Sequence, residues 1–240
     1  MKDVLLQAVH LSKSFGGLRA LDDVTLTLRR GEARAVIGPN GAGKSTLLHL
    51  LSGALLPDRG TIFFKGMPLV GLPPYQIARL GIARTFQISQ LFEGLTVADA
   101  VRLALARGKL RSLDPETLHR LLEQLGLGLQ AHRRARELSH GERRLVELAL
   151  AVAQRPTLCL LDEPTAGLDP SESERIVHVL LDLKERQHTL LIVEHDMGVV
   201  RAVADTVTVL HQGRVWAEGT PDEIRRDARV QKIYELEIEG

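Results

Sequence analysis

Gly38-Pro39-Asn40-Gly41-Ala42-Gly43-Lys44-Ser45-Thr46 is the stretch that decides the fold. It matches the pattern G-x-x-x-x-G-K-[ST], which is specific when a strand precedes it and a helix follows it. Here an apolar run, residues 33–37, comes before the stretch, and a helix-like segment, residues 44–52, overlaps its end. The context therefore predicts a strand, a glycine-rich turn and a helix, an arrangement in which backbone N–H groups surround phosphate oxygens.

The side chains of this loop suit a nucleoside triphosphate. Lys44 is placed to reach the β- and γ-phosphates, and the Ser45 hydroxyl is placed to hold Mg²⁺. The alternative, a glycine-rich turn with an exposed lysine, is disfavoured because both the spacing and the context match. The predicted phosphate-contacting residues are Gly38, Pro39, Asn40, Gly41, Ala42, Gly43, Lys44, Ser45 and Thr46.

A second segment, residues 157–163, is an apolar strand that ends in two carboxylates. Asp162 falls at the carboxyl end of the strand, where open α/β sheets bind ligands, and is predicted to help hold Mg²⁺. Glu163 is predicted to orient or deprotonate the attacking water. By itself this pattern is typical of a strand that enters a polar turn. The phosphate loop upstream makes the catalytic interpretation the better one.

The composition excludes several classes of protein. The chain has 240 residues, of which 44% are hydrophobic and 25% charged, so it is neither disordered nor fibrous. Its net charge of +1 argues against a dedicated nucleic-acid binder. A single cysteine excludes an intramolecular disulfide framework. The longest apolar runs, such as residues 190–193, are far too short to span a membrane.

The hydrophobic pattern alternates between strands and helices. Strands are predicted at residues 24–28, 33–37, 61–65, 157–161, 190–193 and 206–210, and a helix at residues 170–187. Residues 96–154 are mainly helical and open with the capping box Thr96-x-x-Asp99. The pattern predicts an α/β fold with a mainly parallel sheet, into which the helical segment is inserted. We expect one unit with lobes rather than two independent domains.

The segment Leu138-Ser-His-Gly-Glu142 opens a helix that continues to about residue 154. Ser139 and Glu142 form a capping box, which would explain the segment without any ligand. The segment also resembles the signature of the ATP-binding-cassette family, usually Leu-Ser-Gly-Gly-Gln, in which His140 and Glu142 replace a glycine and the glutamine. The resemblance implies that ATP is the nucleotide and that Ser139, Gly141 and Glu142 contact it.

The same resemblance assigns four more residues. It places Gln87 in the Q-loop, where it would touch Mg²⁺ or the attacking water, and Asp169 in the D-loop. It makes His195 the switch histidine that contacts the γ-phosphate, and Phe15 the aromatic residue that stacks on adenine. Alone, three of them have an ordinary structural interpretation: a helix cap for Asp169, a structural histidine for His195 and a core residue for Phe15. Their joint order along residues 5–234 favours the functional one.

The resemblance also implies an architecture. It is the P-loop NTPase fold of ABC ATPases, with a mainly parallel core sheet, an antiparallel β subdomain and an inserted helical subdomain. The whole chain, 1–240, would be one ATP-binding domain, with the core and β subdomain at about 1–90 and 155–240 and the helical subdomain at about 91–154. Two subunits would bind ATP head to tail, the phosphate loop of one facing the Ser139 segment of the other.

Two stretches narrow the resemblance to one branch of the family. Gly81-Ile-Ala-Arg-Thr-Phe-Gln87 and Glu194-His-Asp-Met197 are similar to the ATPases of branched-chain amino-acid and of urea or short-amide uptake systems. Residues 138–141 and 207–213 resemble the urea type, and residues 165–170 the amino-acid type. The resemblance implies import of a small polar solute, with branched-chain amino acids favoured and urea or short amides as the alternative.

Such a subunit has several implied partners. They are integral-membrane permeases, a second ATPase that is either identical or a paralogue, and, indirectly, a solute-binding protein outside the membrane. No nucleic acid is expected. The chain would lie peripherally on the cytoplasmic face of the inner membrane. The segment around Gln87, with residues 91–136, would form the groove for a permease helix.

Three other functions compete with uptake. A lipopolysaccharide-export ATPase has similar length and motifs, but Arg84-Thr-Phe-Gln argues against it. Soluble cassette ATPases without a permease usually carry two cassettes or long coiled coils, and this chain has neither. A nucleotide-binding scaffold without hydrolysis is disfavoured because Glu163 and His195 are both present.

Overall fold

The strands of the chain form two sheets. A computed structural model describes residues 3–85, 93–107 and 115–238. The larger sheet contains β3 (Ala33–Ile37), β6 (Ile82–Arg84), β7 (Leu158–Asp162), β8 (Thr189–Val193), β9 (Thr206–His211) and β10 (Arg214–Gly219). Its strand order is β10-β9-β3-β8-β7-β6, and every pair is parallel except β9 with β10. The mainly parallel core sheet is therefore confirmed.

Short apolar runs build the centre of this sheet. All five residues of β3, β7 and β8 are buried. Strands covered on both faces are almost continuously hydrophobic, which is why these runs were recognisable in the sequence. β6 and β7 are neighbours in the sheet, although about seventy residues separate them in the chain. The helical segment is thus an insertion between two adjacent strands.

The smaller sheet is antiparallel, in the order β2-β1-β4-β5. It contains β1 (Val4–Phe15), β2 (Leu18–Arg29), β4 (Arg59–Phe64) and β5 (Met67–Pro68). The predicted strand 24–28 is the second half of β2, and the predicted strand 61–65 corresponds to β4. β1 was not predicted because its alternation is interrupted: Leu5 and Leu6 are both buried, and its pairing with β2 shifts register several times.

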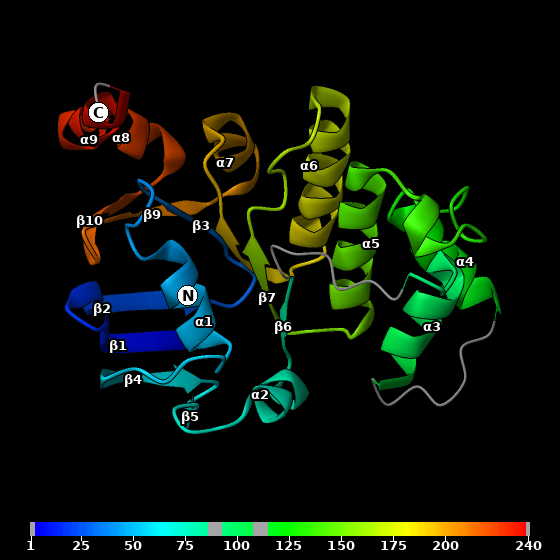
Figure 1. The fold of residues 1–240 in the computed structure, drawn as a ribbon, viewed down its shortest axis with the longest axis horizontal. Coiled ribbons are helices and arrows are strands. Elements are labelled where there is room, and N and C mark those ends of the chain that lie inside the picture. Colours follow the sequence, from blue (N-terminus) through cyan, green and yellow to red (C-terminus); the bar gives the residue numbers. More distant parts are fainter. Residues whose placement is uncertain (1–2, 86–92, 108–114, 239–240) are drawn as a thin grey trace.

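The helices lie around the parallel sheet. They are α1 (Lys44–Leu51), α2 (Pro74–Leu80), α3 (Val97–Arg107), α4 (Pro115–Gln124), α5 (His140–Ala153), α6 (Pro170–Glu185), α7 (Met197–Val203), α8 (Pro221–Arg226) and α9 (Ala228–Ile238). In Figure 1, α3 and α4 stand at one end, beyond α5 and α6, and the antiparallel sheet stands at the other. Among the residues that the structure describes, no helix is both long and apolar enough for a membrane span.

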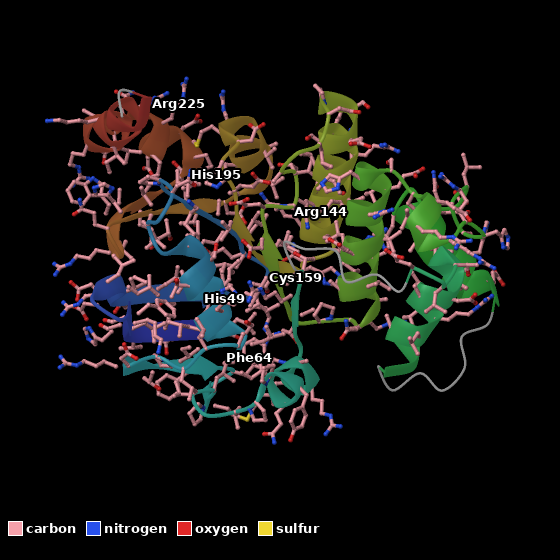
Figure 2. The ribbon with its side chains drawn as sticks, viewed as in Figure 1. His49, Phe64, Arg144, Cys159, His195 and Arg225 are labelled. Carbon is pink, nitrogen blue, oxygen red and sulfur yellow. The ribbon has the colours of Figure 1, made fainter. Side chains whose placement is uncertain are left out.

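Three hydrophobic cores share the strands of the parallel sheet. The first joins one face of the sheet to α3–α7, and the second joins the opposite face to α1 and the antiparallel sheet. The third joins β3, β9 and β10 to α7–α9. Within β7, Cys159 and Leu161 face the first core, whereas Leu158 and Leu160 face the second. Figure 2 labels Cys159 in the parallel sheet and Phe64 in the antiparallel sheet, both fully buried. The predicted subdomain boundary near residue 91 lies outside the described residues.

Candidate nucleotide-binding site

The glycine-rich loop follows β3 at the carboxyl edge of the parallel sheet and leads into α1, as predicted. Gly38 has a φ of +148°, and a Cβ there would overlap the carbonyl oxygen of Leu210 in β9. Gly41 has a φ of +78°, but a Cβ there would meet no heavy atom within 4 Å beyond its chain neighbours. The first glycine lets the loop pass close to β9, and the second faces open space, which leaves room for phosphate oxygens at the loop.

Lys44 lies buried at the start of α1. Its Nζ donates hydrogen bonds to the carbonyl oxygens of Gly38 (2.6 Å) and Pro39 (2.9 Å), so the ammonium group lies against the loop. Gly43, the residue before α1, provides no side chain to cap the helix. The N–H groups of the first turn therefore have no side-chain acceptor at the cap, and together with Lys44 they form a positively polarised site.

Asp162 ends β7, which packs against α1, the helix that carries Ser45. The carboxylate is 1% exposed, and its Oδ2 lies 3.1 Å from the Nη2 of Arg84 at the end of β6. Its Oδ1 is buried without a hydrogen-bond partner. An unbonded buried carboxylate oxygen is unfavourable, and a hard divalent cation would provide the missing partner. Asp162 and Ser45 therefore fit a Mg²⁺ ion.

Glu163 and His195 are brought together from neighbouring strands. Glu163 follows β7 with a left-handed φ of +47°, and its backbone N–H donates to the carbonyl oxygen of Val193 in β8 (2.9 Å). The Oε1 of Glu163 lies 2.7 Å from the Nε2 of His195, which follows β8. The carboxylate is more enclosed than the imidazole, whose side chain is 42% exposed. This arrangement can hold a proton acceptor and a hydrogen-bond donor beside the phosphate loop.

The Ser139 segment begins α5 with the predicted capping box. The Ser139 Oγ accepts from the Glu142 N–H (3.1 Å), and the Oε2 of Glu142 accepts from the Ser139 N–H (2.8 Å). Partial burial acts to raise the pKa of Glu142, but hydrogen bonds from Ser139 and Gln130 and the charge of Arg133 outweigh it, and the pKa lies below its ordinary value. Glu142 is therefore an ionised cap.

A second carboxylate reaches the same helix start. The Ser139 Oγ donates to the Oε1 of Glu172 in the first turn of α6 (3.1 Å), and a Cβ on Gly141 would overlap the side chain of Glu172. Glu172 is not recognisable as a site residue in the sequence, because its position three residues after Asp169 is typical of a local cap. An anionic group thus already lies against Ser139 and Gly141.

Asp169 caps α6, as its sequence suggested. It accepts hydrogen bonds from the Glu172 N–H (2.9 Å) and the Ser171 hydroxyl (2.8 Å), which hold its pKa below the ordinary aspartate value. Phe15 is not a core residue, since it is 46% exposed, and the Lys13 ammonium lies 5.7 Å from its ring centre. Gln87, the last predicted catalytic residue, lies outside the described residues.

Two charged residues next to the site were missed. Arg84 and Glu194 both stand in stretches that carry the family resemblance, without a role of their own. The structure places the Arg84 guanidinium against Asp162. Glu194 is 3% exposed and accepts hydrogen bonds from the loops on both sides of it. The available sequence signals were a charged residue in a three-residue strand, Arg84, and a carboxylate directly after an apolar strand, Glu194. Neither signal reveals which residue is the partner.

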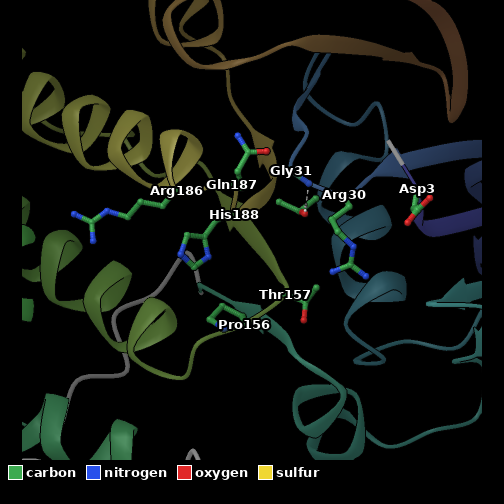
Figure 3. Close-up of a pocket in the computed structure, with 9 residues that line it drawn as sticks. Asp3, Arg30, Gly31, Pro156, Thr157, Arg186, Gln187 and His188 are labelled. Carbon is green, nitrogen blue, oxygen red and sulfur yellow. Dashed lines mark hydrogen bonds between the residues drawn. The ribbon is translucent and has the colours of Figure 1, made fainter. Parts of the chain in front are cut away.

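A separate cavity of about 430 Å³ lies elsewhere (Figure 3). Its lining includes Gly31, Pro156 and His188, which come shortly before β3, β7 and β8. The phosphate loop, Asp162 and His195 follow the same strands. Because these strands are parallel, the cavity is at the opposite edge of the sheet from the predicted nucleotide site.

Comparisons with known proteins identify the family to which the chain is similar. The family model described as "ABC transporter" matches residues 21–166. The high-affinity branched-chain amino acid transport ATP-binding protein LivG of Salmonella typhimurium is 38% identical over 98% of this chain and 98% of its own length. The corresponding protein BraF of Pseudomonas aeruginosa is 35% identical, with the same coverage of both chains.

Solved structures show the same fold. The ADP conformation of MJ1267, an ATP-binding cassette of an ABC transporter, superposes with a TM-score of 0.85 at 31% identity and covers 96% of this chain and 98% of its own. The dimeric structure of MJ0796, a bacterial ABC transporter cassette, has a TM-score of 0.81 at 27% identity and covers 90% and 99%. A family model over more than half of the chain, and relatives of this identity along nearly its whole length, show that the chain belongs to the ATP-binding-cassette (ABC) transporter family.

Proposed function

We propose that this chain is the ATP-hydrolysing subunit of an importer for small polar solutes, with branched-chain amino acids as the expected cargo. The observation that carries the proposal is the convergence of three features on the carboxyl ends of adjacent strands. They are the phosphate loop after β3, the half-bonded Asp162 at the end of β7, and the Glu163–His195 pair that follows β7 and β8. The names of LivG and BraF support the choice of cargo.

The residues have distinct roles in the proposed reaction. The loop N–H groups and Lys44 bind the phosphates of ATP, and Lys44 exchanges its two carbonyl partners for phosphate oxygens. Ser45 and Asp162, with Gln87 as a further ligand, would hold Mg²⁺, and the ion would supply positive charge against the transferred phosphoryl group. Glu163 orients the attacking water and accepts its proton, and His195 donates a hydrogen bond toward the γ-phosphate. Phe15 offers an exposed ring for the adenine.

The N-termini of α5 and α6, at Ser139 and Asp169, belong to the other half of the proposed mechanism. They face the ATP bound by a second subunit, so each ATP lies between two chains. Ser139 and the backbone of Gly141 then contact the γ-phosphate in place of Glu172, and Glu142 holds the turn in its capped form. A dimeric cassette among the similar structures supports this arrangement. ATP closes the dimer, and hydrolysis reopens it.

The proposed assembly includes other chains. Two permeases in the membrane and a second cassette complete the transporter, and a solute-binding protein delivers the cargo. The chain acts at the cytoplasmic face of the membrane. Urea or a short amide is the second candidate cargo, because residues 138–141 and 207–213 resemble the urea type.

Hydrolysis is tested on the purified chain. We expect Mg²⁺-dependent release of phosphate from ATP, reduced at least about 100-fold in Lys44→Ala because a group that stabilises the transferred phosphoryl charge is lost. We expect Glu163→Gln to bind ATP, to hydrolyse it about 100-fold more slowly or worse, and to remain as an ATP-bound dimer. Light scattering measures the dimer. A monomeric Glu163→Gln protein at saturating ATP and Mg²⁺ would contradict closure between two identical chains.

Cargo is tested by reconstitution. The chain is combined with the permeases and the binding protein encoded beside it, and uptake of radiolabelled leucine and of radiolabelled urea into vesicles is compared. ATP-dependent uptake of leucine, lost with Lys44→Ala, is the expected result. Uptake of urea alone would select the alternative, and ATP hydrolysis without uptake of any solute would reject the import function.

A further inference from the structure

Glu194 joins the two loops that carry Glu163 and His195. Its Oε1 accepts hydrogen bonds from the Thr165 backbone N–H (3.0 Å) and the Thr165 hydroxyl (2.5 Å). Its Oε2 accepts from the backbone N–H groups of His195 (2.9 Å) and Asp196 (3.4 Å). The side chain is therefore a buried carboxylate whose two oxygens are each bonded to a different loop.

This connection occurs where the sheet stops holding the two strands together. The register of β7 with β8 ends at the pair Asp162 and Val193, and beyond it the Glu163 N–H still bonds to Val193. Glu163 has a left-handed backbone conformation, which costs a residue with a side chain about 1 kcal/mol or more. Hydrogen bonds to a carboxylate are about twice as strong as neutral ones, so Glu194 can hold the loop in this conformation.

We propose that Glu194 is a positioning residue for hydrolysis. By holding Thr165 on one side and the His195 backbone on the other, it keeps the Glu163 carboxylate 2.7 Å from the His195 ring. The inference rests on the proposed ATPase function. It predicts an effect on the rate of the chemical step and not on ATP affinity, because the hydrogen bonds of the Glu194 carboxylate go to Thr165, His195 and Asp196 and not to the phosphate loop.

The threonines of the fold provide a matched pair of variants. Thr165→Val removes the hydroxyl that bonds to Glu194 but keeps the branched shape and the backbone N–H. Thr189→Val makes the same chemical change at the opposite end of β8, where the Thr189 hydroxyl accepts from the Gly31 N–H (2.9 Å, dashed in Figure 3). Both threonines are buried, with 7% and 1% of their surface exposed.

Two further variants probe Glu194 itself. Glu194→Gln keeps the size of the side chain but sets an NH₂ group against N–H donors, so one loop loses its acceptor. Thr165→Ser keeps the hydroxyl and is the conservative rescue. If Thr165 and Glu194 act through one interaction, the double variant Thr165→Val/Glu194→Gln loses no more activity than the worse single variant.

The experiment measures kcat for Mg²⁺-dependent ATP hydrolysis, and Kd for a fluorescent ATP analogue, on the purified full chain. We expect Thr165→Val and Glu194→Gln to lower kcat about 10-fold or more and to leave Kd within about twofold. We expect Thr165→Ser and Thr189→Val to keep kcat within about twofold of the wild type.

Three results would overturn the inference. They are an unchanged kcat in Glu194→Gln, an equal loss of kcat in Thr165→Val and Thr189→Val, and a rise in Kd as large as the fall in kcat. The last two indicate general damage to the fold. A wild-type chain that binds ATP but does not hydrolyse it would instead contradict the proposed function, so the two failures are distinguishable.

Discussion

Alanine at Gly38 and alanine at Gly41 are expected to damage the protein in different ways. Both glycines have positive φ angles, but only Gly38 has a backbone carbonyl, that of Leu210, in the place where a Cβ would lie. A left-handed residue with a side chain costs about 1–2 kcal/mol, which is the whole cost at Gly41. At Gly38 the chain must also separate from β9, so the cost is at least about 3 kcal/mol, in the range of severe core substitutions.

These costs translate into measurable unfolding temperatures. For a chain of this size, 1 kcal/mol of destabilisation lowers Tm by roughly 2–4 °C. We therefore expect Gly41→Ala to lower Tm by about 2–8 °C and Gly38→Ala by about 6 °C or more, with the larger loss always in Gly38→Ala. Circular dichroism during heating measures both. Equal Tm values for the two variants would refute the argument from the close approach of Leu210.

Nucleotide binding separates the two variants further. The methyl group of Gly41→Ala would enter the open space beside the loop, where phosphate is predicted to bind, so a folded protein should bind ATP at least about 10-fold more weakly. Gly66→Ala is the matched control, because Gly66 has nearly the same φ, +77° against +78°, and equally open surroundings in the hairpin between β4 and β5. It should lose similar stability and bind ATP normally. Normal ATP binding by Gly41→Ala would show that phosphate does not occupy the space beside Gly41.

Two further predictions concern single side chains. Burial raises the pKa of Cys159 to about 12, so its thiolate fraction at pH 8 is about 10⁻⁴. This single cysteine should therefore resist Ellman's reagent in the native protein and react fully in denaturant. Rapid labelling of the native protein would contradict the burial of Cys159. The hydrogen bonds to Asp169 lower its pKa, so its contribution to stability is complete above the ordinary value of 3.8 and is lost as the pH falls through the lower folded value. Asp169→Asn keeps a capping oxygen but lacks the charge. The difference in Tm between the wild type and this variant should shrink as the pH falls below 3.8. A difference in Tm that does not change with pH would contradict the role of the Asp169 charge.

Local spacing explains which parts of the molecule were predictable. The phosphate loop, the strand that ends at Asp162, and the caps at Ser139 and Asp169 depend on residues within a few positions of one another, so the pattern predicted them. β1 has a broken alternation, and β6 has only three residues, too few for a periodic signal. The central strands were recognisable because burial on both faces requires an unbroken apolar run.

Contacts between distant residues were not predictable from a single sequence. Arg84 meets Asp162, and Glu172 meets Ser139, only because of the order of the strands and the packing of α5 against α6. The pairing of Thr165 with Glu194 likewise follows from the adjacency of β7 and β8. Each of these residues has a common local explanation, such as a cap or a polar turn. The positions of the predicted site residues were therefore more accessible to sequence analysis than the groups that hold them in place.

The alternation of β7 between two cores has a consequence for how the molecule unfolds. Leu158 and Leu160 pack with α1 and the antiparallel sheet, while Cys159 and Leu161 pack with helices α3–α7. A strand whose two faces are anchored in different cores cannot leave one core while the other stays intact. We therefore expect cooperative, all-or-none melting, with the inserted helices and the nucleotide-binding sheet disappearing in one calorimetric transition.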